Sequence, residues 1–483
     1  MKKLYDLYIE DIGFKGVGIS KLDSGKKVIL NGTVLPNSIV DAIVKKNKKD
    51  YIQARVCDIK KIDKNYKTTD ELCPHYFFPY KDIENDKNTG CGGCKKSIIP
   101  YEKQIQLKKN ILSNTFKDIW QDDIDIIPAP FRRQYRNKVE FSFGNIQSGD
   151  KNLGFHKQGM FSKVVDVQRC YLISEKMHSV FEYLKQYFLD SSLPFYDQKK
   201  HEGFFRHLIV RYGYNTEQLM INLSVAPGYI SNNLQENKKW NYLLEKLQKD
   251  EFLQKNIQSF FITYNKSLSD AIKSNESEVE LLFGKESIDE QLSIGDQTVD
   301  FEYGLFSFFQ TNTMAAEKLF ANAFDMVGKV DGTVLDMYCG IGTIGILYAK
   351  YFGVDNLVGI ESVNEAIQYA NINASKNGLQ NYKFWVGDTE KVLPNNSELW
   401  DSLSDVGLVF VDPPRDGLGK KTIKFLGQLK NHKNFKLVYI SCNPTTMSSD
   451  ILRLQKYGFE LSKIRCVDMF PNTYHVESIG VLD

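Results

Sequence analysis

Residues 1–62 carry short β-prone runs that are separated by turn signals such as Asp23-Ser24-Gly25 and Asn31-Gly32. Strands are expected over 11–19, 27–30, 38–45 and 51–59. The even spacing of short strands in a small segment predicts a five-stranded β-barrel, a type that often binds nucleic acid. This pattern makes residues 1–62 a candidate RNA-binding module.

Residues 63–300 mix helical and strand patterns. After a polar, cysteine-bearing segment, a helical pattern begins near residue 99, and the prolines at 128 and 130 end it. A helix within 99–127 could pack on the last domain. The remainder is expected to form strands over 138–143, 164–167, 204–212 and 218–225 and helices over 177–190 and 240–249. This range is predicted to be a mixed α+β central domain.

From about residue 301, strand and helix patterns alternate. Strands are expected over 333–336, 356–361, 383–386, 408–411 and 436–441. Such alternation is typical of a doubly wound, Rossmann-like parallel sheet. At 483 residues the chain is too long for one core. The predicted fold class is α/β and multidomain, with domains at 1–62, 63–300 and 301–483.

Composition narrows the possible partners and compartment. The chain has 62 basic and 60 acidic residues, but residues 1–67 hold 15 Lys or Arg against 8 Asp or Glu. This local excess favours a polyanionic partner, although a solvated surface would look the same. Neither a secretory signal nor 18 uninterrupted apolar residues occur, so we expect a cytoplasmic protein without a membrane partner or an evident obligate protein partner. Eight cysteines in that compartment indicate metal binding or catalysis.

Two predicted strands end in reactive residue types. Ser441-Cys442-Asn443-Pro444 follows the strand at 436–441, and Asp412-Pro413-Pro414-Arg415 follows the strand at 408–411. Parallel sheets place their chemistry at the carboxyl ends of strands. A buried structural thiol is the alternative for Cys442. The position at a strand end favours a catalytic site.

A glycine-rich turn follows the strand at 333–336. Gly340, Gly342 and Gly345 satisfy G-x-G-x-x-G, and Glu361 ends the next strand. Glycines let a ligand approach the backbone, and the acid can bind a ribose hydroxyl. Both a dinucleotide and S-adenosylmethionine would fit this pattern.

Three acids favour the methyl donor. Asp336 lies just before the turn and suits the amino group of a methionine moiety, whereas Asp388 can meet an adenine amino group. Asp412 opens a D-P-P-R sequence that resembles the signature of methyltransferases acting on a base. An oxidoreductase is therefore the weaker interpretation.

Motifs in matching order resemble the RNA (uracil-5-)-methyltransferases. Those motifs are Phe309-Gln310-x-Asn312, Asp336-Met337-Tyr338-Cys339-Gly340-x-Gly342, Asp412-Pro413-Pro414-Arg415, Ser441-Cys442-Asn443-Pro444 and His475-Val476-Glu477-Ser478, with Tyr135-Arg136-Asn137-Lys138-Val139-Glu140-Phe141 and Leu153-Gly154-Phe155-His156-Lys157 in the middle. The opening segment also resembles the TRAM domain, an RNA-binding barrel. The resemblance covers nearly the whole chain.

The resemblance assigns roles to two residues. Uracil C5 is a poor nucleophile, so a thiolate first adds to C6, and the ring can then attack the sulfonium methyl. Cys442 is the implied nucleophile. Glu477 is the implied base that removes the C5 proton before the thiolate is eliminated.

The family further implies a cofactor set. Gln310, Tyr338, Glu361 and Asp388 are expected to contact S-adenosylmethionine beside the Gly340 loop. Asp412 has two possible roles, because it could hold the cofactor or bond to the uracil edge.

Four cysteines resemble the ligands of an iron-sulfur cluster in one branch of the family. They are Cys73, Cys91, Cys94 and Cys170. A [4Fe-4S] cluster is favoured over tetrahedral zinc or no metal. Between the first two lie 17 residues, more than the family usually has, so an inserted loop is expected over 80–89. The cysteines at 57, 339 and 466 are interpreted as packing residues.

Three of the ten arginines cluster beside two aromatic residues. Arg132, Arg133 and Arg136 lie next to Phe131 and Tyr135, as in sites that grip single-stranded RNA, although a solvated loop is the alternative. A barrel with a cysteine cluster suggests, by family analogy, a uridine of 23S rRNA as the target. A tRNA uracil-54 methyltransferase and a noncatalytic RNA-binding protein are the other hypotheses.

Overall fold

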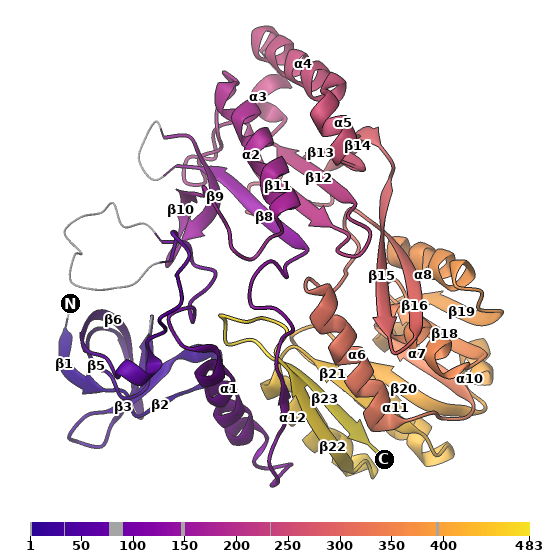
Figure 1. Ribbon diagram of the computed structural model, residues 1–483. Helices are drawn as coiled ribbons and strands as arrows, with labels where there is room; N and C mark the ends of the chain where they lie inside the picture. The colour runs from indigo at the N-terminus through magenta and orange to yellow at the C-terminus, as the bar shows by residue number, and fades with distance from the viewer. Residues whose placement is uncertain (1, 33, 77–89, 146–149, 232, 393–395) are drawn as a thin grey trace.

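The computed structural model describes residues 2–32, 34–76, 90–145, 150–231, 233–392 and 396–483. Three sheets and one hairpin follow one another along the chain (Figure 1). The mixed α/β class predicted from the sequence is confirmed. The expected inserted loop at 80–89 lies outside the described residues. Across these described ranges, we find no helix with the length and apolar character needed to cross a membrane.

The first sheet, called the N-terminal sheet below, has the strand order β1-β5-β6-β4-β3-β2. Its strands are β1 (Lys3–Tyr8), β2 (Asp11–Ile12), β3 (Gly18–Lys21), β4 (Lys27–Asn31), β5 (Ile39–Asn47) and β6 (Tyr51–Lys61). The sheet has six strands rather than the predicted five. Four strand ranges were predicted; Lys3–Tyr8 adds an edge strand, and the 3₁₀ turn Phe14–Gly16 divides the predicted 11–19 strand into two, which gives six. A second 3₁₀ turn, Lys64–Tyr66, follows the sheet.

The central sheet has the order β10-β9-β8-β11-β12-β13-β14. Its strands are β8 (Lys138–Gly144), β9 (Asn152–Lys157), β10 (Met160–Asp166), β11 (Phe205–Tyr212), β12 (Leu219–Val225), β13 (Ser259–Tyr264) and β14 (Glu278–Gly284). The accompanying helices are α2 (Glu175–Asp190), α3 (Gly228–Ser231), α4 (Leu234–Lys249) and α5 (Glu251–Asn256). Every residue of β11 and β12 is buried, including the polar side chains of Arg206, His207 and Arg211.

The C-terminal sheet has the order β19-β18-β17-β20-β21-β23-β22-β7. Its strands are β17 (Thr333–Met337), β18 (Asn356–Glu361), β19 (Asn381–Val386), β20 (Val406–Val411), β21 (Lys436–Ser441), β22 (Leu461–Val467), β23 (Glu477–Leu482) and β7 (Ile126–Ile127). The five predicted strands are all present and parallel. The sequence interpretation missed β22, β23 and β7.

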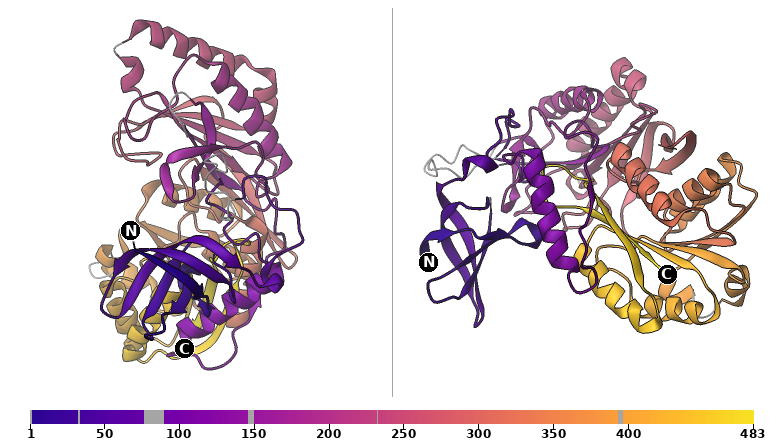
Figure 2. Two further views of the ribbon diagram at one scale, coloured as in Figure 1. Left: turned by 90° about the vertical axis from the view of Figure 1, so that its left-hand side faces the viewer. Right: turned by 60° about the horizontal axis from the view of Figure 1, so that its bottom comes forward.

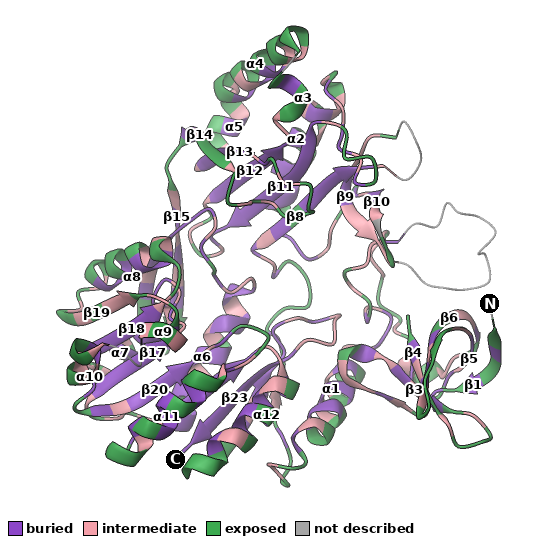
Figure 3. Ribbon diagram, turned by 180° about the vertical axis from the view of Figure 1, so that it is seen from behind, coloured by how far each residue is buried: buried purple, intermediate pink, exposed green. Residues whose placement is uncertain are grey.

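Helices cover both faces of this sheet. They are α6 (Thr313–Val327), α7 (Thr343–Phe352), α8 (Asn364–Lys376), α9 (Thr389–Val392), α10 (Ser397–Ser402), α11 (Lys420–His432) and α12 (Pro444–Leu454), with a 3₁₀ turn at Gln455–Tyr457. Seen from behind, the strands are largely buried while the outer faces of α8 and α11 are exposed (Figure 3). This alternation of buried and exposed positions produced the helical signal in the sequence.

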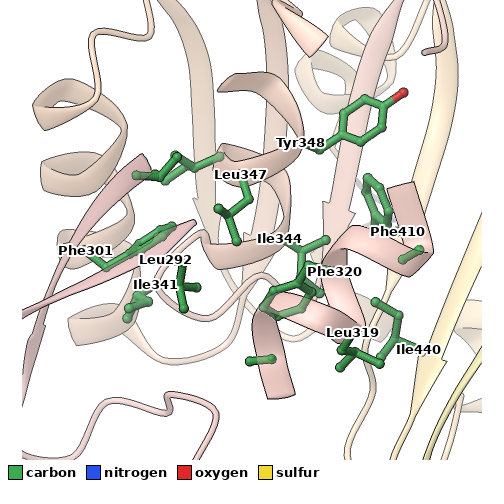
Figure 4. Packing of buried hydrophobic residues seen from close by; sticks show 14 of the residues in the cluster. Leu292, Phe301, Leu319, Phe320, Ile341, Ile344, Leu347, Tyr348, Phe410 and Ile440 are labelled. Atoms are coloured by element: carbon green, nitrogen blue, oxygen red, sulfur yellow. The ribbon is translucent and has the colours of Figure 1, made fainter. Parts of the chain in front are cut away.

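A long hairpin, β15 (Ser287–Ile294) and β16 (Gln297–Gly304), connects the central and C-terminal sheets. Its inward residues Leu292 and Phe301 belong to the same core cluster as Leu319, Ile344 and other residues of the C-terminal layers (Figure 4). The hairpin is therefore packed on the C-terminal sheet.

Helix α1 (Tyr101–Phe116) lies between the N-terminal sheet and the C-terminal sheet (Figure 2, right). Leu107 belongs to the core of the N-terminal sheet, whereas Leu112 belongs to the core of the C-terminal sheet. The fully buried Nζ of Lys108 donates to Asp468 at 2.6 Å. Breaking such a buried pair is costly, because one charge would be left unpaired. The helix therefore fixes the two sheets relative to each other.

Candidate active site and cysteine-lined cavity

The candidate catalytic residues lie at the carboxyl ends of the parallel strands. β17 pairs with β18 on one side and with β20 on the other, so the winding reverses between β17 and β20. Open α/β sheets form a ligand crevice at such a switch point. Tyr338 follows β17, Asp412 follows β20 and Cys442 follows β21. The cofactor loop, an acid and a thiol therefore reach one edge of the sheet.

Glu477 reaches the same edge because β23 runs antiparallel beside β21. The register pairs Ser441 with Ser478. Cys442 directly follows Ser441, and Glu477 directly precedes Ser478. Since paired residues in antiparallel strands have Cα atoms about 5 Å apart, the thiol and the carboxyl group start from neighbouring backbone positions. The structure therefore brings the predicted catalytic pair together.

The residues around Cys442 explain why this sequence forms a sharp strand-to-helix turn. Ser441 Oγ accepts from the Asn443 N–H at 3.1 Å, and the Asn443 side chain caps α12 by accepting from the Thr445 N–H. Pro444 occupies the first turn of the helix, where its missing N–H costs nothing. Asn443 Nδ2 also donates to the Arg415 carbonyl at 2.9 Å, which joins this turn to the D-P-P-R loop.

The electrostatics of this edge are dominated by acids in a poorly solvated place. Burial raises the pKa of Cys442 to about 11, with further contributions from Glu477 and Asp412. Burial raises the pKa of Asp412 to about 7, and burial followed by the Asp412 charge raises the pKa of Glu477 well above its ordinary value. Perturbed groups of this kind are typical of functional sites.

Arg415 is the cation that opposes these shifts. Its charge lowers the pKa of both Cys442 and Glu477. Its own side chain is exposed. The sequence interpretation quoted Arg415 only as part of a motif and gave it no role, although its place after a strand end was the available signal.

The glycine loop after β17 has the backbone expected of a ligand-binding turn. Tyr338 and Gly340 have φ values of 63° and 55°, and Gly342, at φ 84°, begins α7. A Cβ at Gly342 would lie 2.6 Å from Ile346, so only glycine fits there. A Cβ at Gly340 would meet no atom within 4 Å. The space in front of Gly340 is therefore open to a ligand.

Two acids hold this loop in shape. Glu361 Oε2 accepts from the Gly340 N–H at 3.2 Å, at the carboxyl end of β18. Asp336 Oδ2 accepts from the Gly345 N–H at 2.8 Å, and its carboxyl group is fully buried. Asp336 therefore holds the loop through Oδ2, while its buried Oδ1 has no hydrogen-bond partner among the described residues.

The remaining cofactor candidates come from separate elements. Asp388 lies two residues after β19, is exposed, and accepts from the Glu390 N–H at 2.9 Å. Tyr338 hydroxyl lies 3.2 Å from Thr422 Oγ1 of α11. Gln310 lies in the loop before α6, where its carbonyl accepts from Asn137 of the central domain at 2.9 Å. Gln310 is thus held by a residue of the central domain.

The four candidate metal ligands line one cavity of about 1180 Å³. They are Cys73, Cys91, Cys94 and Cys170. Burial raises the pKa of all four thiols, and neighbouring thiols raise the pKa of Cys91, Cys94 and Cys170 further. Four soft sulfur donors facing one space are chemically suited to iron-sulfur or zinc. Within the described residues, however, no three such side chains are close enough to form a completed metal-binding group.

Short backbone contacts hold these loops together. The Cys91 N–H donates to the His75 carbonyl at 2.9 Å, and Cys91 also bridges to Lys157 of β9. Cys73 Sγ lies 3.9 Å from the Arg169 carbonyl, next to Cys170. Cys73 and Arg169, which are 96 positions apart in the sequence, are thus brought together.

The arginine cluster lines the same cavity. Arg132 lies over the Tyr101 ring at 5.6 Å and Arg133 over the Tyr171 ring at 4.6 Å. Phe131 is half exposed, as a base-stacking residue requires, whereas Tyr135 is buried and its hydroxyl donates to the Pro471 carbonyl. Tyr135 therefore packs the structure instead of facing RNA. The ring partners of the arginines are Tyr101 and Tyr171, which local sequence did not indicate.

Comparison with known proteins extends over the whole chain. Residues 243–483 match the family model described as tRNA (Uracil-5-)-methyltransferase. An uncharacterized RNA methyltransferase of Caldanaerobacter subterraneus subsp. tengcongensis is 33% identical over 479 residues, covering 98% of this chain and 97% of that protein. Another, from Clostridium acetobutylicum, is 32% identical over 483 residues, covering 99% and 97% respectively.

One solved structure resembles the whole molecule. The Pyrococcus abyssi tRNA (uracil-54, C5)-methyltransferase, in complex with S-adenosyl-L-homocysteine, is 25% identical, with a TM-score of 0.71. The match covers 99% of this chain and 99% of that chain. The similarity therefore includes the N-terminal and central sheets as well as the C-terminal sheet.

Proposed function

Since the chain belongs to the S-adenosylmethionine-dependent RNA (uracil-5-)-methyltransferases, we propose that it methylates C5 of a uridine in 23S rRNA through a covalent bond from Cys442 to uracil C6. The observation that carries the proposal is the β21–β23 register, which sets Cys442 beside Glu477 at the edge where the cofactor loop opens. A thiol and a base are the two groups that this reaction requires from the protein.

Cys442 acts first. Its thiolate forms a bond to C6, and the electron pair of the C5–C6 double bond moves into the ring to give an enolate. The acids around Cys442 oppose ionisation of the thiol, whereas Arg415 favours it. We infer that Arg415 supplies the positive charge that makes thiolate formation possible at this edge.

Glu477 acts last. After transfer, C5 carries both a methyl group and a proton. Glu477 removes that proton, the double bond forms again, and the C6–S bond breaks to release the thiolate. Its raised pKa makes the carboxylate a stronger base than an exposed one, and Arg415 opposes full protonation.

The cofactor candidates surround the open space before the Gly340 loop. S-adenosylmethionine supplies the methyl group when bound. We assign Glu361 to the ribose hydroxyls and Asp388 to the adenine amino group, with Tyr338 and Gln310 as further contacts. Asp412 lies between this loop and Cys442 in strand order, so it either holds the cofactor or bonds to the uracil edge.

The cysteine-lined cavity is proposed to hold a [4Fe-4S] cluster, with zinc as the alternative. Its support is the donor set, four thiols on converging loops. A cluster there would tie the segments at 73–76, 90–97 and 169–173 together. Reddish-brown protein with broad visible absorption supports iron-sulfur, whereas colourless, anaerobically purified protein with stoichiometric zinc contradicts it.

The RNA target follows from weaker observations. The arginine and aromatic side chains of the large cavity suit single-stranded RNA, in which the target base can leave its stack. The N-terminal sheet and the cysteine loops favour 23S rRNA by family analogy. The similarity to a tRNA uracil-54 enzyme along the whole chain favours tRNA as the second candidate.

One assay tests these alternatives. The protein is incubated anaerobically with methyl-labelled S-adenosylmethionine and with unmodified 23S rRNA or tRNA, and 5-methyluridine is then mapped. Label in one rRNA uridine is the expected result, and label at tRNA position 54 selects the second candidate. Binding of RNA without transfer to either would contradict the enzyme assignment and support a noncatalytic RNA-binding protein.

A further inference from the structure

The 3₁₀ turn Phe14–Gly16 of the N-terminal sheet reaches the catalytic cysteine. Phe14 and Cys442 line the same small cavity, of about 10 Å³, together with Tyr474 and His475 of the loop that leads to Glu477. A cavity of this size holds about one water molecule. Phe14 and Cys442 thus face the same narrow space. A residue far from the catalytic sheet in sequence forms a wall beside the proposed nucleophile.

The turn is pressed against the catalytic loop. Lys15 and Gly16 both have positive φ, at 63° and 70°. A Cβ at Gly16 would lie 3.5 Å from Tyr474 Cβ and 3.1 Å from Lys96 Cε. The left-handed turn thus allows close approach of the N-terminal sheet to Tyr474.

Lys96 holds this arrangement. Its Nζ donates to the Val34 carbonyl at 3.3 Å and to the Gly16 carbonyl at 3.5 Å, while its main-chain N–H donates to the Asn472 carbonyl at 2.9 Å. The side chain is buried, and none of the ion pairs among the described residues includes it. Burying a cation without a carboxylate partner is costly. We therefore attribute the presence of Lys96 to the hydrogen bonds that it donates to the Val34 and Gly16 carbonyls.

Asn472 connects Lys96 to the rest of the loop. It has a φ of 66°, and its side-chain Oδ1 accepts from Gln104 Nε2 of α1 while its main-chain N–H donates to Gln104 Oε1. Further along the loop, Thr473 Oγ1 accepts from the His475 N–H, and the rings of Tyr474 and His475 lie 4.3 Å apart. The loop is therefore supported by α1, by Lys96 and by the Phe14 turn.

We propose that Phe14 is a positioning residue of the catalytic site, held by Lys96, and that the N-terminal sheet completes the wall beside Cys442 as well as contributing to RNA binding. The role in turnover rests on the proposed methyl transfer, whereas the wall itself does not. If the N-terminal sheet only bound RNA, substitutions in it would change only the affinity for RNA. A wall would change the exposure of Cys442 and the rate after RNA has bound.

The wall is tested first without RNA. The intact protein is treated with iodoacetamide, and alkylation of Cys442 is compared with that of Cys57 on β6 by peptide mass spectrometry. Phe14→Ala should raise the rate at Cys442 about fivefold relative to Cys57, because the thiol becomes accessible. Phe14→Leu, which refills most of the space, should remain within about twofold of wild type. Equal rates in Phe14→Ala and wild type would overturn the proposal.

Turnover is tested with the RNA that the wild type methylates. Under single-turnover conditions with saturating RNA and S-adenosylmethionine, Phe14→Ala and Lys96→Met should lose about tenfold in rate at unchanged RNA Kd. Tyr8→Ala removes another aromatic ring from the same sheet, outside the cavity walls described, and should keep its rate. A loss that disappears at saturating RNA would overturn the positioning role. If Cys442 were alkylated faster in Phe14→Ala but the wild type methylated no RNA, the proposed function would be contradicted and the wall beside Cys442 would stand.

Discussion

Two regions carry the candidate chemistry, and they are built differently. At the edge of the C-terminal sheet, the positions of Cys442 and Glu477 are fixed by adjacent paired strands. In the large cavity, Cys73, Cys91 and Cys170 come from loops joined by isolated bridges and single hydrogen bonds. Strand register leaves little freedom, whereas loops adapt to what they bind. We therefore expect the sheet edge to be preorganised and the cavity to be completed by its metal.

The two regions meet in the loop at 468–476. Asn472 lines the large cavity, whereas Tyr474 and His475 line the small cavity at Cys442. One short segment thus lies between the cysteine cavity and the catalytic pair. The comparison shows that the sheet positions Cys442 and Glu477 by strand pairing, whereas the loop at 468–476 is positioned by contacts with other domains.

Cys442→Ala should have the largest effect. Without the thiol no bond to C6 forms, and the rate of methyl transfer should fall by at least about 10⁴-fold, as measured by label incorporation. Cys57→Ala is the matched control, because that thiol lies on β6, and it should stay within about twofold of wild type. If Cys442→Ala retained its rate, the sheet edge would not be the reaction site.

Glu477→Gln should slow turnover by about 10³-fold, because no base removes the C5 proton. Addition and methyl transfer still occur, so a covalent protein–RNA complex should accumulate. It is measured as a slowly migrating band on a denaturing gel, with the methyl label in the RNA. If the variant turned over normally and no such band formed, Glu477 would not be the base that removes the C5 proton.

Asp412→Asn tests whether the sheet edge is as poorly solvated as the structure shows. Burial raises the pKa of Asp412 from 3.8 to about 7. Between these values the folded protein keeps a proton that the unfolded chain has released, so wild-type stability falls as pH rises. The Asn side chain does not titrate, so the variant does not show this pH dependence. The free energy of unfolding of the variant minus that of wild type should therefore increase by about 2 kcal/mol from about pH 4 to about pH 7 in urea titrations. If the difference in free energy of unfolding did not change with pH, Asp412 would not be as poorly solvated as proposed.

Cys94→Ser should have the smallest effect on transfer. The variant should lose the visible absorption of the cluster and about 4 °C in Tm, because a bound metal stabilises only the folded state. Its single-turnover rate should remain within about threefold of wild type. Cys57→Ser is the control for loss of a thiol. Complete loss of transfer at unchanged Tm would make the cavity part of the reaction site and remove the contrast between the two regions.

Much of the fold was predictable because its signals are local. The strands β17 to β21 have clear local patterns, and their predicted ranges agree within a few residues, whereas α1 begins near the predicted start but ends at Phe116, well before the prolines. The strand β7 was not predictable, because two residues carry no pattern and their pairing with β22 depends on the packing of α1. The edge strand β1 was missed for a related reason, since only one of its faces is buried.

The sequence by itself determined the chemical groups and the turns that present them. The Gly340 loop, Asp412 and Cys442 follow strands whose residues specify both the strand and its end. Which of these groups lie next to one another could be seen only from the tertiary structure. The antiparallel β23 brings Glu477 to Cys442, Tyr135 is buried, and the Phe14 turn lines the small cavity at Cys442. These outcomes depend on contacts between distant segments, and local sequence patterns do not encode such contacts.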